Sequence, residues 1–99
     1  MKNLRTYQLA KELYQQGQKL GFKGELKNQF ERASLSVVLN ISEGAGKSGK
    51  DRKRFFMIAM GSLREVQACL DITGSSLTAL ADQVGGSLHR LIQNPGPGI

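Results

Sequence analysis

Five cations stand close together near the middle of the chain, and positive charge at this density is suited to binding phosphate. They fall within residues 47–54 and are Lys47, Lys50, Arg52, Lys53 and Arg54. A concentrated positive field attracts polyanions over long distances, and these side chains bind phosphate groups directly. Nothing nearby is typical of base recognition, which needs an aromatic platform or a recognisable RNA-binding signature. The cluster therefore predicts sequence-nonspecific contact with the backbone of a nucleic acid.

The charge of the whole chain agrees with this prediction but leaves an alternative open. The formal net charge is +6, from 14 Lys and Arg against 8 Asp and Glu. Residues 1–54 hold twelve basic and five acidic side chains, so all of the excess lies in the first half. A net charge of this size is also ordinary for small domains, where it maintains solubility. Five further cations are interpreted as an extension of the patch along the first helical hairpin or as scattered surface charge: Arg5, Lys11, Lys19, Lys23 and Lys27.

Polar residues recur beside the apolar stripes of the second and third expected helices. They are Arg32, Asn40, Glu43, Ser62 and Glu65. We expect a structural network of hydrogen bonds, with Arg32 neutralising a carboxylate. The alternative is a metal or acid–base site built from Glu43 and Glu65, but helical di-iron sites use Glu-x-x-His on two helices. The one histidine, His89, has no glutamate three residues before it.

Other motifs add no catalytic or cofactor chemistry. The string 44–48, Gly-Ala-Gly-Lys-Ser, lacks the first glycine of a phosphate loop, because position 41 is Ile41, and a helix rather than a strand precedes it. We expect Cys69 to be a buried, inert thiol and His89 to lie on the surface. Gly61 stands in mid-helix, which indicates a close approach by another helix. The sequence thus predicts a protein that is not an enzyme and that binds no metal and no cofactor.

Helical periodicity dominates the chain, and no alternating run indicates a sheet. The clearest stripe is Phe56, Ala59, Leu63, Val66 and Leu70, at steps of three and four residues. The pattern predicts an all-α fold, an antiparallel up-down four-helix bundle in one domain over residues 1–93. The expected helices are about 2–19, 25–44, 49–73 and 76–93, followed by a Pro/Gly tail over 94–99.

Local signals mark the ends of these helices and their surroundings. Ser48 and Asp51 have the form of a capping box opening the third helix, and Gly44 and Gly46 are expected to end the second. The single cysteine favours a reducing compartment. No apolar run approaches the roughly 20 residues of a membrane span. We therefore expect a cytoplasmic protein without membrane contact.

The residues also carry a family resemblance over 4–72. The string 32–44 reads Arg-Ala-Ser-Leu-Ser-Val-Val-Leu-Asn-Ile-Ser-Glu-Gly, and Phe55, Phe56, Ile58-Ala59 and Gly61-Ser62-Leu63-Arg64-Glu65 follow the basic loop. In these features the chain resembles the small four-helix-bundle proteins encoded by intervening sequences in bacterial 23S ribosomal RNA genes. The match is weaker over 77–92, where the connection at 73–76 is shorter than is usual in the family. The resemblance implies a ring-shaped homo-oligomer, commonly a pentamer, with an electropositive surface. It also implies a relationship to the accessory protein of diversity-generating retroelements, which binds nucleic acid and a reverse transcriptase.

Two functions follow as hypotheses. The preferred one is a non-enzymatic, oligomeric nucleic-acid-binding protein, an RNA-associated or retroelement accessory factor in which subunit repetition adds avidity. The alternative is a structural or protein-interaction module whose basic residues engage an acidic protein such as a reverse transcriptase.

Overall fold

The computed structural model describes residues 4–94, and the regular secondary structure of this part of the chain is helical, with no strand. It contains four α-helices, α1 (Arg5–Gly17), α2 (Gly24–Ala45), α3 (Gly49–Thr73) and α4 (Thr78–Gln93), with a 3-10 turn η1 (Gln18–Leu20) after α1. The predicted all-α fold with four helices is confirmed. Most of the expected Pro/Gly tail, 95–99, and the expected helical residues 2–3 lie outside the described residues.

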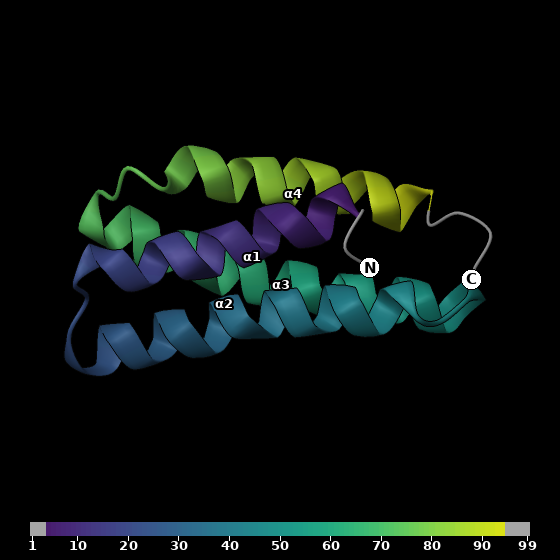
Figure 1. The fold of residues 1–99 in the computed structure, drawn as a ribbon, viewed down its shortest axis with the longest axis horizontal. Coiled ribbons are helices and arrows are strands. Elements are labelled where there is room, and N and C mark those ends of the chain that lie inside the picture. Colours follow the sequence, from purple (N-terminus) through teal and green to yellow (C-terminus); the bar gives the residue numbers. More distant parts are fainter. Residues whose placement is uncertain (1–3, 95–99) are drawn as a thin grey trace.

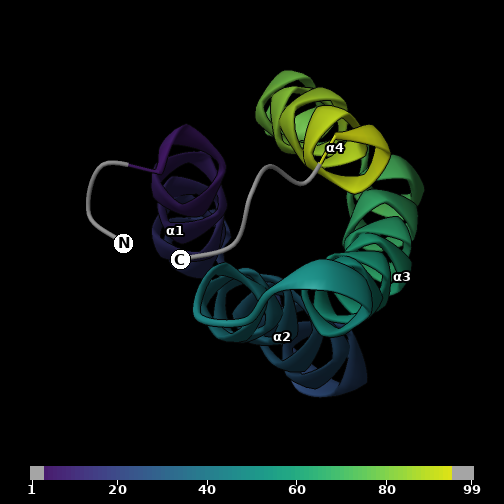
Figure 2. The same ribbon diagram turned by 90° about the vertical axis from the view of Figure 1, so that its right-hand side faces the viewer.

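The helices lie side by side along the long axis of a molecule measuring 40 × 21 × 21 Å. The chain doubles back at each connection (Figure 1), and the end view shows α1 to α4 following one another around the axis (Figure 2). Each helix contacts the next in sequence, and α1 also contacts α4. The helices α2 and α3, of 22 and 25 residues, are about 33 and 38 Å long. They are the two longest helices of the bundle and carry the candidate site.

The core is built from the apolar stripes that the periodicity predicts. In α3 the five residues of the clearest stripe are all at most 1% exposed. Burying a Leu, Val, Ile or Phe side chain contributes about 1.5–3 kcal/mol to stability, so these stripes supply most of the free energy that folds the four helices into a bundle. The largest side chains that complete the core from the other helices are Leu13, Phe30, Val37, Ile41, Val84 and Leu88.

The turn between α2 and α3 corrects one prediction and refines another. Ser48 occupies the N-cap position of α3 with extended backbone angles, but its side chain makes no capping hydrogen bond, so the predicted capping box is wrong. Asp51 nevertheless lies in the first turn, where a carboxylate complements the helix dipole. Helix α2 ends at Ala45 with Gly46 as its C-cap, whereas Gly44 is still helical and buried.

The prediction for Gly61 is wrong within the chain. This glycine lies on the exposed side of α3, and a Cβ placed on it would meet nothing within 4 Å. No other helix of the described chain packs closely against it. Within residues 4–94, none of the helices combines the length and the apolar character that crossing a bilayer demands.

Candidate nucleic-acid interface

The basic cluster lies at one end of the bundle, on the turn between α2 and α3 and on the first two turns of α3. Lys47, Lys50, Lys53 and Arg54 are exposed. Because α3 begins at Gly49, the last three of these project from the end of a helix dipole that is already positive. Their charges therefore add to the partial charge of the helix terminus, and together they form a local positive field.

Arg52 is diverted from this surface into a structural contact. Its guanidinium donates from Nε to the carbonyl oxygen of Gly44 at 3.2 Å and from Nη2 to that of Ala45 at 2.8 Å. Both oxygens belong to the last turn of α2, where carbonyl groups lack partners inside the helix. Arg52 therefore fastens the start of α3 onto the end of α2 and compensates the negative end of the α2 dipole. The geometry gives it a positioning role, whereas the sequence placed it among the phosphate contacts.

Close packing beneath the turn explains why Arg52 can reach these carbonyl groups. A Cβ on Gly44 would lie 2.7 Å from Cε1 of Phe56 and 3.1 Å from the carbonyl oxygen of Arg52. The absence of a side chain at Gly44 lets the ring of Phe56 lie directly against the α2 backbone. The turn is consequently held from both sides, by a buried ring and by an arginine, and the exposed cations project from a rigid base.

Arg54 has two further neighbours that orient it. Its guanidinium carbon lies 4.7 Å from the centroid of the Phe55 ring, in a cation–π arrangement. Its Nη2 lies 3.9 Å from Oδ1 of Asp51, with both side chains more than 60% exposed. An exposed pair at this distance contributes little stability, about 0–1 kcal/mol, and is screened by salt. Arg54 therefore stays accessible to an anion in solution.

Three of the five further cations of the first half do not extend this patch. Lys19, Lys23 and Lys27 are exposed on and beside the turn that joins α1 to α2, and this turn lies at the opposite end of the bundle (Figure 1). From Lys27 to its end at Ala45, α2 spans about 27 Å. Arg5, the first residue of α1, and Arg90, in the last turn of α4, belong instead to the end that carries the basic cluster.

The predicted polar residues form two separate groups between α2 and α3. Nη2 of Arg32 lies 3.3 Å from Oε2 of Glu65, with the side chains 64% and 54% exposed, and Arg32 also donates to Gln29. About one turn further along, the hydroxyl groups of Ser36 and Ser62 are 2.8 Å apart.

Asn40 joins the second group and Glu43 joins neither. The Nδ2 of Asn40 donates to the carbonyl and hydroxyl oxygens of Ser36, at 2.9 and 3.1 Å. Glu43 is exposed, and the eleven residues of α2 between it and Arg32 span about 16 Å. Glu43 and Glu65 therefore cannot share one ion, and nowhere in residues 4–94 do three His, Cys, Asp or Glu side chains gather as a metal site would require.

The remaining single residues are placed as follows. Cys69 is 7% exposed, and its burial, reinforced by the nearby negative charge of Glu65, raises the pKa of its thiol above the ordinary 9.0. The thiol is thus protonated at neutral pH, as expected for an inert cysteine. His89 is exposed on α4, as predicted.

The sequence reasoning missed two features that matter here. Ser36 is the centre of the second polar group, because it bonds to both Ser62 and Asn40. Nothing in its sequence position, two residues before the buried Val38, indicated this role. Thr6 of α1 and Ser87 of α4, 81 positions apart, bond to each other inside the core. Because both residues lie on otherwise apolar faces, periodicity alone could have placed them inside, but it could not have paired them.

Comparison with known proteins identifies a family. The family model for the 23S rRNA-intervening sequence protein matches residues 2–94. No curated protein and no solved structure matches the chain. The match covers all four helices and the basic turn.

Proposed function

The chain belongs to the family of 23S rRNA-intervening sequence proteins, and from this premise we propose that it is a non-enzymatic, RNA-associated protein. It contacts phosphate groups of a nucleic acid without sequence preference, through Lys47, Lys50, Lys53 and Arg54. The observation that carries the proposal is the exposure of these four cations around the N-terminus of α3. Arg52 supports them by holding the turn in place.

The placement of the cations argues against a purely solvating role. Lys and Arg are unfavourable in the first turns of a helix, because their charge opposes the positive end of the dipole. Phosphate reverses this balance, since it is attracted both by the cations and by free backbone N–H groups at a helix N-terminus. The N-cap Ser48 makes no side-chain hydrogen bond to these groups.

Assembly into a ring, with a pentamer favoured by the family resemblance, is part of the proposal. A few phosphate contacts on one subunit bind weakly, but repetition around a ring converts them into avidity. Exposed apolar side chains on the outer faces of α2 and α3 support association between copies: Leu35, Leu39, Ile58 and Ile72. The mass in solution tests this part, and a monomer at micromolar concentration would refute the ring.

Nucleic-acid binding is tested with matched charge variants. In one variant Lys47, Lys50 and Lys53 become Gln, and in the other Lys19, Lys23 and Lys27 become Gln. Both lose three positive charges from exposed positions, so they have the same net charge. Binding of a fluorescein-labelled single-stranded RNA, and of a DNA duplex, is followed by anisotropy across a salt series.

The proposal expects parental binding that weakens steeply with salt. The first variant should lose most of the affinity, and the slope of log K against log salt should fall by about 2, for three phosphate contacts on a single strand. The second variant should bind nearly as the parent does. Equal losses in the two variants would mean that only the net charge matters, and absence of binding at low salt would refute the proposal.

A second candidate function is favoured by one observation. Apolar side chains stand exposed beside the cations, with Met57 55% and Ile58 42% exposed. Phosphate groups make no favourable contact with apolar side chains, whereas the apolar surface of a partner protein does. The candidate is a protein-interaction module for an acidic partner, such as the reverse transcriptase of a retroelement.

A further inference from the structure

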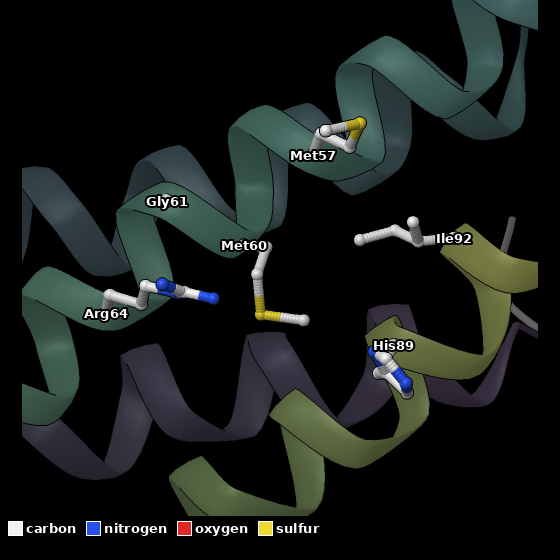
Figure 3. A pocket seen from close by; sticks show the side chains of 6 residues that line it. All are labelled: Met57, Met60, Gly61, Arg64, His89 and Ile92. Atoms are coloured by element: carbon white, nitrogen blue, oxygen red, sulfur yellow. The ribbon is translucent and has the colours of Figure 1, made fainter.

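Two neighbouring hollows lie along α3. The first is a hollow of about 340 Å³ between α3 and α4, lined by Met57, Met60, Gly61, Arg64, His89 and Ile92. Met60 of α3 and Ile92 of α4 point into the space between the two helices, with Arg64 and His89 at its edges (Figure 3). A second hollow of about 400 Å³ is lined by Lys50, Lys53, Arg54, Met57 and Ile58. Met57 lines both hollows, which together are called the α3 groove.

The floor of the α3 groove is apolar and accessible. Met57 is 55% and Ile58 is 42% exposed, and Met60 and Ile92 are half-buried. An exposed apolar patch with a polar rim is typical of a protein-binding site. Methionine suits such a site, because its flexible, polarisable side chain adapts to a partner.

Gly61 gives the groove a flat place on α3. A glycine in a helix interior costs about 1 kcal/mol relative to alanine, and no part of the described chain within 4 Å makes use of the missing side chain. Small residues on a helix surface allow the backbone of a second helix to approach closely. The chain's own packing gives no reason for Gly61, whereas a helix lying in the groove would.

The rim of the groove is positively charged. Its charges come from Lys50, Lys53, Arg54 and Arg64, beside the polar His89, and no Asp or Glu lines either hollow. Asp51 pairs with Arg54 but does not line the groove. Arg64 follows Lys50 by fourteen positions, which correspond to about 21 Å along α3, the length of four helical turns.

We propose that the α3 groove binds an acidic amphipathic helix of a partner protein. The apolar stripe of that helix packs on Met57, Met60 and Ile92, its backbone passes over Gly61, and its carboxylates face the cations of the rim. This is the helix-in-groove mode of recognition, with anchors at helical spacing. A nucleic acid fits the groove less well, because phosphates gain nothing from an apolar floor and no aromatic side chain lines it for stacking. The proposal does not rest on nucleic-acid binding.

The probe is a synthetic, fluorescein-labelled helical peptide of about 18 residues, or five turns, with Leu on one face and Glu on the other. A second peptide has the same composition with the Leu positions shuffled, and a third has Lys in place of Glu. The proteins are the parent, Gly61→Ala and Gly61→Gln. Since Gly61 is helical and surrounded by open space, both substitutions should raise the free energy of unfolding, so lost binding cannot be ascribed to misfolding.

The parent should bind the first peptide at least tenfold more tightly than the other two. Gly61→Ala should retain most of this affinity, and Gly61→Gln should lose at least tenfold. Equal binding of the shuffled peptide, or undiminished binding by Gly61→Gln, would overturn the proposal. It would also be overturned if Gly61→Gln bound the peptide normally but lost RNA, or if the peptide failed to bind while Gly61→Gln turned an oligomer into a monomer. Those two results would assign the groove to nucleic acid or to a second copy of the chain. The salt series on the Lys47, Lys50 and Lys53 variant remains an independent test of the proposed function.

Discussion

The ring of Phe30 occupies the place where a side chain on Gly17 would stand. A Cβ built on Gly17 would lie 2.0 Å from Cε1 and 2.2 Å from Cζ of that ring. Phe30 is 1% exposed and also packs edge-on against Phe22, with ring centroids 5.2 Å apart. The contact brings the end of α1 against the start of α2 and so sets the spacing of the first helical pair.

Gly17→Ala should therefore destabilise the bundle despite the higher helix propensity of alanine. The buried ring can move only by displacing other core side chains, and overpacking of this kind costs about 1–3 kcal/mol. Urea unfolding followed by circular dichroism measures the change. An unfolding free energy equal to or above that of the parent would show that Phe30 has room to move.

Gly86→Ala is the matched substitution in open space and should act in the opposite direction. Gly86 is exposed in α4, and its added Cβ would meet Arg90 Nη1 at an ordinary 3.9 Å. Alanine lowers the conformational entropy of the unfolded chain, so the free energy of unfolding should rise by about 0.5–1 kcal/mol. A decrease in the same urea experiment would contradict the description of this part of α4.

Arg52→Met should lower stability, whereas Lys53→Met should not. Both substitutions remove one positive charge, but only Arg52 holds the carbonyl oxygens of Gly44 and Ala45. Hydrogen bonds from a charged group contribute about 1.5–3 kcal/mol, and a half-buried one falls toward the lower end. Lys53 is exposed, so its loss should change stability by less than about 0.5 kcal/mol. Equal unfolding free energies for the two variants would remove the structural role assigned to Arg52.

The fold was predictable because its main determinant is local. Residues such as Phe56, Leu63 and Leu70 recur at helical spacing, and four stripes of this kind leave a bundle as the simplest way to bury them. Details that depend on packing between helices were not predictable. The glycine at position 44 was read as a helix end, but its role is to admit the ring of Phe56.

The candidate site was predictable as a charge cluster but not as a geometry. The sequence alone brings Lys47, Lys50, Lys53 and Arg54 together, because they are neighbours in the chain. It does not say that a short turn brings Arg52 back over the end of α2. The polar network was predicted only in part: Arg32 does meet the carboxylate of Glu65, but Glu43 lies three turns from Arg32, because the helix register decides which residues meet. Gly61 was correctly marked as unusual, but its expected neighbour is not in the described chain.

The Thr6–Ser87 hydrogen bond predicts a strong coupling between α1 and α4. The two side chains are 2% and 6% exposed, so Thr6→Val leaves the Ser87 hydroxyl buried without this partner and should cost about 1–3 kcal/mol. Adding Ser87→Ala removes the orphaned hydroxyl. The free energy of unfolding lost in the double variant should therefore be smaller than the sum of the two single losses, by about 0.5–3 kcal/mol. Strictly additive losses in a double-mutant cycle would show that the two hydroxyl groups do not interact.

Cys69 predicts a stability loss at alkaline pH that can be isolated from other titrations. Burial, followed in size by the charge of Glu65, raises the pKa of the folded thiol above 9.0. The unfolded thiol ionises at its ordinary pKa while the folded one stays protonated, so ionisation stabilises the unfolded state relative to the folded state as the pH rises beyond 9.0. The contribution of the buried thiol is thus fully present below that pH and is lost as the pH rises through the folded pKa. Comparison with Cys69→Ala cancels the contributions that the two proteins share. The difference in unfolding free energy between the parent and Cys69→Ala, measured by urea unfolding, should therefore be constant below 9.0 and should decrease above it. A difference that stays constant across this range would show that burial and Glu65 do not raise the pKa of the thiol.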